Sequence, residues 1–171
     1  MKQMNHNPIE LLRAGEADLP AISALAGEIW RECYVEIISR EQIEYMLQWM
    51  YDVATLRREL REEVRYEKVL VAGELAGFAA WGPATEPGLC KLHKLYLHQQ
   101  VRSQGVGSAA LRHVLTEAGK AGFAEMRLNV NKKNAAAIAA YQRHGFLVIQ
   151  EIRADIGNGF VMDDFIMARQ L

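Results

Sequence analysis

The chain has 171 residues and a mass of 19.3 kDa, and half of its residues are apolar, so residues 1–171 are expected to form a single domain with a substantial core. Twenty Lys and Arg against 21 Asp and Glu give a formal net charge of −1, with both signs interleaved, which argues against a nucleic-acid or membrane partner. Cys33 and Cys90 are too few for a disulfide framework or a Cys-rich metal site. Residues 1–18 lack the apolar segment of a signal peptide or anchor, so we expect a cytoplasmic protein.

Hydrophobic periodicity divides the chain into helices, with apolar residues every three or four positions, and strands, with alternating ones. The expected elements, in chain order, are a strand at 9–12, helices at 18–33 and 39–53, strands at 66–72, 75–81 and 89–97, a helix at 106–119, a strand at 126–130, a helix at 134–143, and strands at 146–152 and 160–167. This order predicts an α/β fold with a mixed central sheet and helices on both faces.

Local signals refine these elements. Ser39 can cap the second helix while Gln42 reaches back to it, as in a capping box. A turn at Gly73 and Glu74 joins the two strands on either side into an antiparallel hairpin.

The strand at 89–97 carries apolar residues on both faces. Alternation places Leu95 and Leu97 on one side. Leu92 and Tyr96 fall on the other side. Both faces are therefore expected to be partly buried.

The stretch from Leu95 to Ser108 has the pattern of a strand, a polar loop and then two glycines that open a helix. The first N–H groups of a helix are unpaired and carry partial positive charge, so they favour a phosphate. Gly105 and Gly107 remove the Cβ atoms that would block a close approach, and Arg102 can add a charged contact. The stretch predicts a phosphate-binding loop.

Other interpretations of this loop compete. Gly105, Gly107 and Ala110 fit the Gly-x-Gly-x-x-Ala pattern of a dinucleotide fold. In that fold the strand runs almost directly into the first glycine, whereas here seven residues separate Leu97 from it, and Glu125 stands at the start of the next strand instead of its end. A nucleotide P-loop would need a Lys-Ser or Lys-Thr pair after the second glycine. The glycines can also serve only a tight turn.

Two motifs resemble those of a known family. Arg102-x-x-Gly105-x-Gly107 resembles the acetyl-coenzyme A (acetyl-CoA) signature of the GCN5-related N-acetyltransferases, the GNAT family, and the order of elements resembles that fold over nearly the whole chain. The family's second conserved block resembles Asn131-x-x-Asn134-x-x-Ala137-x-x-x-Tyr141-x-x-x-Gly145-Phe146. The resemblance implies a mostly antiparallel GNAT-like sheet and an N-acetyltransferase that uses acetyl-CoA as cosubstrate and no metal.

The resemblance also implies cofactor contacts. The backbone that is expected to pair with the pantetheine arm belongs to Leu95, Tyr96 and Leu97. The loop expected to hold the pyrophosphate consists of Arg102, Ser103, Gln104, Gly105, Val106, Gly107 and Ser108. Asn134 and Tyr141 are seven residues apart and so lie on one face of the predicted helix, where one can hold the cofactor and the other can meet its sulfur.

Tyr141 resembles the family's general acid. A phenol with an ordinary pKa of about 10 stays protonated at neutral pH and can donate to a departing thiolate. An aromatic anchor for the helix is the alternative interpretation. For the base, many family members place a glutamate where this chain has Lys91. His93 lies on the same strand face by alternation and titrates near neutrality, so it is the candidate base, directly or through water.

Further candidates for the base lie where the family builds its acceptor site, in and between the first two helices. They are Glu28, Glu32, Tyr34 and Glu41. Nothing adjacent in sequence activates either cysteine thiol, so an acyl-cysteine intermediate is not expected. We expect direct transfer in a ternary complex.

The acceptor is expected to be a small-molecule primary amine. Residues 156–167 resemble the last hairpin of a subgroup that includes polyamine acetyltransferases of the PaiA type. Asp163 and Asp164 can attract a polycation, although we interpret them as turn residues at a sheet edge. A protein or peptide amine is an alternative acceptor. An acetyl-CoA-binding sensor or interaction module without turnover is an alternative function, and the apolar closing strand permits a homodimer.

Overall fold

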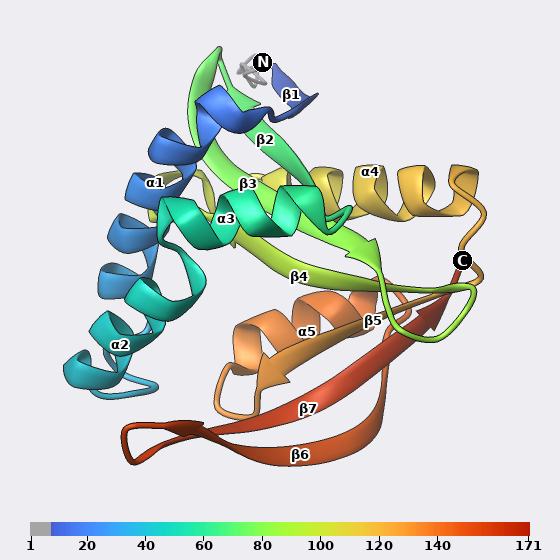
Figure 1. Cartoon of the computed structure of the whole chain (residues 1–171). Helices are drawn as coiled ribbons and strands as arrows, with labels where there is room; N and C mark the ends of the chain where they lie inside the picture. Colours follow the sequence, from blue (N-terminus) through green and yellow to red (C-terminus); the bar gives the residue numbers. More distant parts are fainter. Residues whose placement is uncertain (1–7) are drawn as a thin grey trace, which may run out of the picture.

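The computed structural model describes residues 8–171 (Figure 1). Seven strands form one sheet in the order β1-β2-β3-β4-β5-β7-β6, in which only β4 and β5 are parallel neighbours. Helices α1, α2 and α3 cover the front face in Figure 1, and α4 and α5 cover the back. The predicted α/β fold, with a mixed, mostly antiparallel sheet and helices on both faces, is confirmed. Part of the N-terminal stretch, residues 1–7, lies outside the described residues.

The strands are β1 (Ile9–Arg13), β2 (Arg65–Val71), β3 (Glu74–Pro83), β4 (Leu89–Leu97), β5 (Glu125–Asn131), β6 (Leu147–Gly157) and β7 (Phe160–Gln170). The helices are α1 (Leu19–Cys33), α2 (Arg40–Met50), α3 (Val53–Arg61), α4 (Val106–Lys120) and α5 (Ala135–Arg143), with short 3-10 turns η1 (Glu16–Asp18) and η2 (Gln99–Val101). Within residues 8–171, no helix combines the length and the apolar character needed to cross a membrane.

Helix α3 was not predicted from the sequence. The second helix was expected to run on to Val53, but it ends at Met50, and the Asp52 carboxylate starts a new helix by accepting the N–H of Thr55 at 2.7 Å. Only Leu56 of α3 is fully buried, and the charged residues on its outer face mask the apolar spacing. A narrow apolar stripe in a short, charged helix is a weak signal.

Two details of the turns also differ from the predictions. The Ser39 hydroxyl accepts the N–H of Gln42 at 3.1 Å as expected, but the Gln42 amide does not reach back. It donates instead to the carbonyl of Val161 at 3.1 Å, which ties α2 to β7. The β2–β3 turn is formed by Ala72 and Gly73, both with positive φ, one position earlier than expected.

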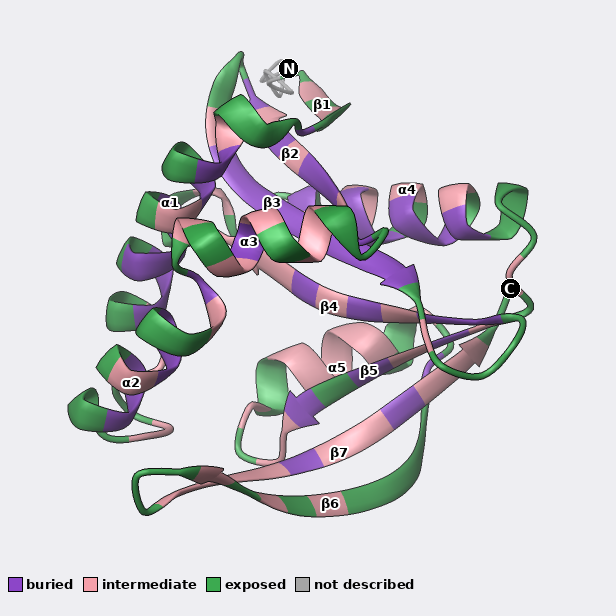
Figure 2. Cartoon of the chain, viewed as in Figure 1, coloured by how far each residue is buried: buried purple, intermediate pink, exposed green. Residues whose placement is uncertain are grey.

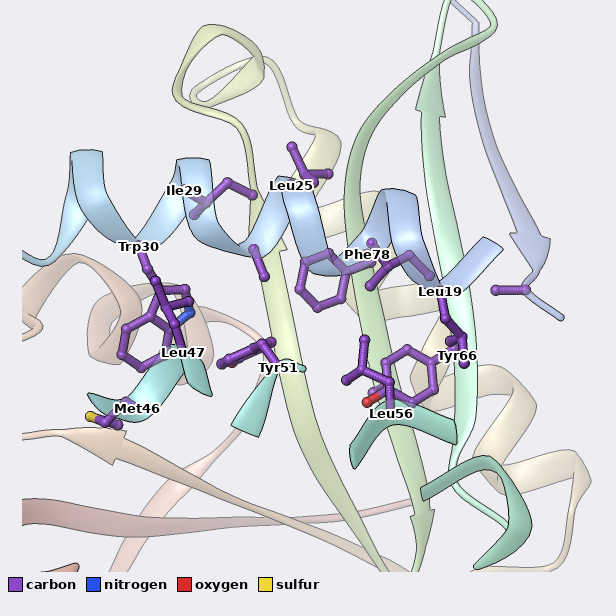
Figure 3. Close-up of a cluster of buried hydrophobic side chains, with 14 of the residues drawn as sticks. Leu19, Leu25, Ile29, Trp30, Met46, Leu47, Tyr51, Leu56, Tyr66 and Phe78 are labelled. Carbon is purple, nitrogen blue, oxygen red and sulfur yellow. The ribbon is translucent and has the colours of Figure 1, made fainter. Parts of the chain in front are cut away.

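The front-face core lies between the sheet and α1–α3. Figure 3 shows its large side chains converging from the three helices and from β2 and β3. Trp30, Tyr51 and Phe78 form its aromatic centre, and burying one such apolar side chain contributes about 2 kcal/mol. Burial is greatest along β3, whereas the edge strand β6 is mostly exposed (Figure 2).

Candidate active site

The sheet opens between β4 and β5. Their parallel pairing begins at Leu89 with Glu125 and stops at Leu92 with Leu128. Residues 93–97 of β4 therefore have no partner on the β5 side, while they stay paired to β3 on the other side. Figure 1 shows the two strands diverging from there. An unpaired strand edge offers N–H and C=O groups to an extended ligand. Leu95, Tyr96 and Leu97, for which a pantetheine contact is predicted, lie on this edge.

A β-bulge at His93 corrects the predicted faces of β4. Ala80 of β3 pairs with Lys94 and Trp81 pairs with Leu92, so His93 is the extra residue. Leu92 therefore shares the back face with Leu95, and the prediction that they face opposite sides is wrong. On the front face, the bulge brings Lys91, His93 and Lys94 close together.

The loop before α4 has the geometry of an anion cradle. Gly105 is the N-cap of α4 with a φ of +79° and no side-chain cap. The backbone N–H groups of residues 103–108 donate to no acceptor in the described part of the chain. An added Cβ on Gly105 would meet no atom within 4 Å, so the space around it is open. Several free N–H groups at one helix N-terminus fit a pyrophosphate.

Arg102 differs from the rest of this loop. Its backbone N–H donates to the carbonyl of Gln99 at 3.2 Å, so it is not free for a phosphate. Its guanidinium donates to the carbonyl of Leu97 at 3.2 Å and lies beside Cys33. The free N–H groups therefore start at Ser103, one residue after the predicted start.

The loop geometry yields a first prediction. Gly105→Ala is expected to raise the KM for acetyl-CoA about tenfold, because a side chain at a φ of +79° costs roughly 1–2 kcal/mol and shifts the cradle. Steady-state kinetics at saturating amine measures it. Gly119→Ala in α4 is the matched control, since its φ is not positive and its Cβ meets no atom within 4 Å. An unchanged KM in Gly105→Ala would contradict the assigned role of the cradle.

Tyr141 lies where α5 faces the opened sheet. Its ring packs edge-on against Phe146 at 5.7 Å between centroids, and burial raises the pKa of its phenol. No hydrogen bond from its hydroxyl is found within residues 8–171, so the proton is held and free to be donated. Tyr34, the C-cap residue of α1, lies close enough to Tyr141 to raise the pKa of its phenol further. Tyr34 also lies near Tyr96 and Asn134. Residues from α1, β4 and α5 thus meet at one point.

Asn134 is not part of the α5 face, contrary to the prediction. It is the N-cap, with a φ of −85° and ψ of 69°, and its side-chain oxygen accepts the N–H of Ala137 at 3.2 Å. The seven-residue alignment with Tyr141 assumed helical geometry at both residues. Capping uses only the side-chain oxygen, and the side-chain N–H₂ lies beside the Tyr34 hydroxyl.

His93 is a weaker base than the sequence suggested. Burial lowers the pKa of its imidazole to about 4, with Lys91 and Lys94 adding to the effect. The expectation of titration near neutrality is therefore wrong. Its Nε2 is buried and has no hydrogen-bond partner among residues 8–171. A neutral ring with a free nitrogen can accept a hydrogen bond from an amine or a water, but it holds a proton poorly.

The depressed pKa of His93 makes a second prediction. In the unfolded chain its pKa is about 6.5, so His93 adds stability above pH 6.5 that is lost as the pH falls toward 4. Urea unfolding at pH 7.5 and pH 5 is expected to show a smaller loss of stability in His93→Gln than in the wild type. Equal losses in both proteins would show that the ring is not desolvated.

The remaining candidate bases divide into two groups. Glu28, Glu32 and Glu41 are exposed on α1 and α2, whereas Tyr34 is at the site. Both thiols are protonated at neutral pH, because burial raises the pKa of Cys33 and raises that of Cys90 to about 11. Neither thiol is an activated nucleophile.

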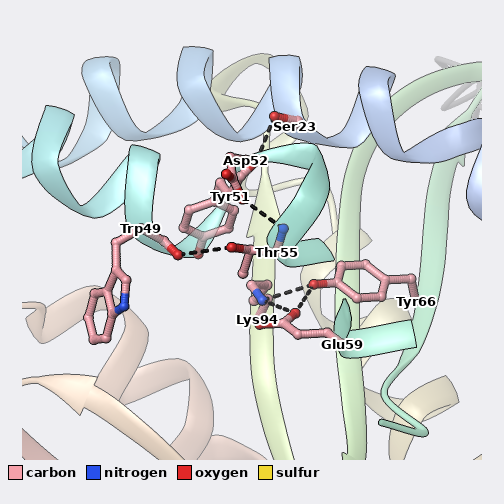
Figure 4. Close-up of polar contacts among 8 residues, drawn as sticks. All are labelled: Ser23, Trp49, Tyr51, Asp52, Thr55, Glu59, Tyr66 and Lys94. Carbon is pink, nitrogen blue, oxygen red and sulfur yellow. Dashed lines mark hydrogen bonds and ion pairs between the residues drawn. The ribbon is translucent and has the colours of Figure 1, made fainter. Parts of the chain in front are cut away.

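A buried ion pair supports the bulge and had no signal in the sequence. The Lys94 ammonium contacts the Glu59 carboxylate and donates to the Tyr66 hydroxyl at 2.8 Å, and Tyr66 in turn donates to Glu59 (Figure 4). Lys94 also lies 5.4 Å from the ring centroid of Tyr51. Burial lowers the pKa of Lys94 while Glu59 opposes that shift. The triad joins β2, α3 and β4, which sequence periodicity does not pair.

Asp163 and Asp164 are strand residues in the middle of β7, so the turn interpretation is wrong. The turn lies earlier, at Asn158 and Gly159, which both have positive φ. Asp163 pairs with Lys132 at 2.8 Å, whereas Asp164 is buried.

Two hollows lie away from this site. One of about 570 Å³ is lined by Arg127, Leu147 and Gln170 at one end of β5–β7. The other, of about 300 Å³, is lined by Val35 in the connection between α1 and α2 and by residues of the two helices, among them Arg31 and Ile43. Neither contains a residue of the cradle or Tyr141.

The fold, the opened sheet and the glycine cradle define an acetyltransferase of one family. Residues 25–146 match the Acetyltransferase (GNAT) family, and the chain belongs to it. It is 25% identical over 164 residues to a spermidine N(1)-acetyltransferase of Thermoplasma acidophilum, covering 91% of this chain and 96% of that protein.

Solved structures agree with this family assignment. The PaiA N-acetyltransferase of Thermoplasma acidophilum, in complex with coenzyme A, superposes with a TM-score of 0.81 at 24% identity over 96% of this chain and 99% of that one. A GCN5-related N-acetyltransferase of Rhodopseudomonas palustris gives 0.80 at 20% identity, over 99% of each chain. The [ribosomal protein bS18]-alanine N-acetyltransferase of Escherichia coli is 35% identical in sequence over 74 residues, which cover 43% of this chain and 49% of that protein.

Proposed function

We propose that this acyltransferase moves an acetyl group from acetyl-CoA to a primary amine by direct transfer in a ternary complex. The observation that carries the proposal is the combination of three features within residues 8–171: the unpaired edge of β4, the free N–H groups of residues 103–108, and the protonated hydroxyl of Tyr141, which makes no hydrogen bond there. When bound, acetyl-CoA supplies the acetyl group as an activated thioester.

The chain's own residues take five roles in this proposal. The cradle from Ser103 to Ser108 holds the pyrophosphate through backbone N–H groups. The edge of β4 from Leu95 to Leu97 orients the pantetheine arm. The Asn134 side-chain N–H₂, which lies beside the Tyr34 hydroxyl, makes a cofactor contact. Tyr141 keeps its proton at neutral pH and donates it to the departing thiolate. His93, neutral and with a free Nε2, accepts a hydrogen bond from the amine or from a water beside it.

The acceptor that we propose is a polyamine. The support is the relative of Thermoplasma acidophilum named for spermidine, which matches nearly its whole length to this chain. A second candidate is a protein N-terminal amine, since the Escherichia coli relative is named for the alanine of a ribosomal protein. That match is limited to 74 residues, so we place it second. A sensor that binds acetyl-CoA without turnover is the third.

The test is release of free coenzyme A thiol from acetyl-CoA with spermidine, spermine, a lysine peptide, an alanine N-terminal peptide and an aminoglycoside as acceptors. We expect turnover with the polyamines and much lower kcat/KM with the peptides. Tight binding of acetyl-CoA without turnover on any amine would favour the sensor.

Two further proposals concern the setting of the enzyme. We place it in the cytoplasm, since the free thiols Cys33 and Cys90 suit a reducing compartment. We also propose a homodimer through the outer edge of β6, where Leu147, Val148 and Ile149 are exposed. Light scattering after size-exclusion chromatography distinguishes a dimer from a monomer.

A further inference from the structure

Asp164 is a buried carboxylate with an unused oxygen. Only 3% of the residue is exposed, and its Oδ1 has no hydrogen-bond partner in the described part of the chain. It lies in the interior of β7, between Asn131 of β5 and Ile152 of β6. Burying an ionised carboxylate without a partner is costly, so the group needs a proton, a water or a ligand to complete it.

The side chain of Asp164 faces the front of the sheet. In a strand, residues two positions apart point to the same face. Met162, two residues before Asp164 on β7, packs against the front core, so Asp164 points to the front as well. Phe165 and Met167 pack against the back core, which confirms the alternation. Lys91 lies on the same front face of β4, since Cys90 and Leu92 point to the back. Asp164 therefore faces the side of the sheet that carries Lys91 and His93.

The charged groups around Asp164 leave its carboxylate only partly compensated. Lys91 from β4 and Lys132 after β5 attract it from a distance, Asp163 repels it, and the Asn129 amide lies near it. Lys132 is already paired with Asp163 at 2.8 Å and with Glu151 at 2.8 Å. Burial raises the pKa of Asp164 above its ordinary value.

Asp164 is placed to bind a positive charge of the acceptor that is remote from its reacting nitrogen. Asp164 pairs with Asn131 of β5, beyond Leu128, where β4 and β5 stop pairing, so it lies more than two strand spacings, about 10 Å, from β4. A monoamine that reacts beside β4 would not reach it. A polyamine carries a second ammonium several bonds farther along its chain, and that ammonium stays protonated during the reaction.

We propose that Asp164 binds the distal ammonium of a polyamine acceptor and so selects polyamines over monoamines. The inference rests on the proposed function and assigns the substrate-binding carboxylate of that same site. The ammonium would supply the hydrogen bond that Oδ1 lacks and would neutralise the buried charge.

The experiment compares Asp164→Asn with Asp163→Asn, using spermidine and butylamine as acceptors. Asp163 is the matched control, because it is the adjacent residue on β7, carries the same charge and is paired with Lys132 on the opposite face. In Asp164→Asn we expect the KM for spermidine to rise about 10- to 100-fold, with kcat within about threefold of the wild type. The KM for butylamine is expected to stay unchanged in both variants.

Two kinetic outcomes would overturn the assignment. Equal effects of the two substitutions would show a general loss of negative charge. A parallel rise in the KM for butylamine would place Asp164 beside the reacting amine. Misfolding is controlled by melting temperature, since removing a buried, unpaired charge is expected to leave the melting temperature of Asp164→Asn at or above that of the wild type.

A binding measurement tests the proposed anchor, the contact between Asp164 and the distal ammonium, separately from catalysis. With coenzyme A present, spermidine is expected to raise the melting temperature of the wild type and of Asp163→Asn, but not that of Asp164→Asn. If the enzyme turns over no amine, the proposed function fails while this shift still reports the anchor. A wild-type melting temperature that does not respond to spermidine overturns the anchor.

Discussion

Tyr141→Phe is expected to lower kcat by about 100- to 1,000-fold while leaving the KM for acetyl-CoA within about twofold. The substitution removes one hydroxyl and keeps the ring that packs against Phe146, so the fold is preserved. The loss follows because burial keeps the hydroxyl protonated and, within residues 8–171, it makes no hydrogen bond that would compete for its proton. Thiol-release kinetics with saturating spermidine measures the effect.

The control for this prediction is a second phenol. Tyr45→Phe removes a hydroxyl that donates to the carbonyl of Ile156 at 2.6 Å, on the side of α2 that contacts the β6–β7 hairpin. Its kcat is expected to stay within about threefold of the wild type. A kcat for Tyr141→Phe that falls no further than that of Tyr45→Phe would leave Tyr141 as an aromatic anchor of α5.

Lys94→Met is expected to cost about 3 kcal/mol of unfolding free energy. The methionine keeps the volume and the apolar stem, but it removes the ammonium that compensates the Glu59 carboxylate and that donates a hydrogen bond to the Tyr66 hydroxyl. Breaking one side of a buried pair leaves the other charge unpaired, which is the expensive case. Urea unfolding at pH 7 gives the change.

The double variant Lys94→Met with Glu59→Gln separates the charge from the packing. Because the second substitution removes the stranded carboxylate, the double variant is expected to be more stable than Lys94→Met alone by about 1–2 kcal/mol. Additive losses would mean that the two side chains contribute independently and that the contact is not a coupled pair.

Lys94→Met also tests the bulge beside it. Lys94 follows His93 on β4, and its ion pair to α3 fixes the side of the strand on which both residues lie. A change in kcat/KM for the amine without a change in the KM for acetyl-CoA is the expected kinetic result, since the cofactor edge begins at Leu95.

The sequence by itself determined the parts of the site that are built locally. Gly105 and Gly107 lie within one loop, and the start of a helix and the positive φ of Gly105 are local properties of the backbone. Tyr141 stands in a single short helix, so a motif of a few residues was enough to select it as a candidate acid. The alternating pattern of β4 also predicted a central strand correctly.

Tertiary structure alone decided which polar groups on these elements are buried and what faces them. The bulge at His93 exists because β3 and β4 pair out of register there, and no period-two pattern predicts an inserted residue. The low pKa of His93 follows from desolvation and from Lys91 and Lys94 brought to its side of the strand. The surroundings of Asp164 depend on the pairing of β7 with β5, a strand far from it in sequence, as well as with its hairpin partner β6. Desolvation depends on the whole surroundings of a group, whereas a sequence pattern reports only its neighbours along the chain.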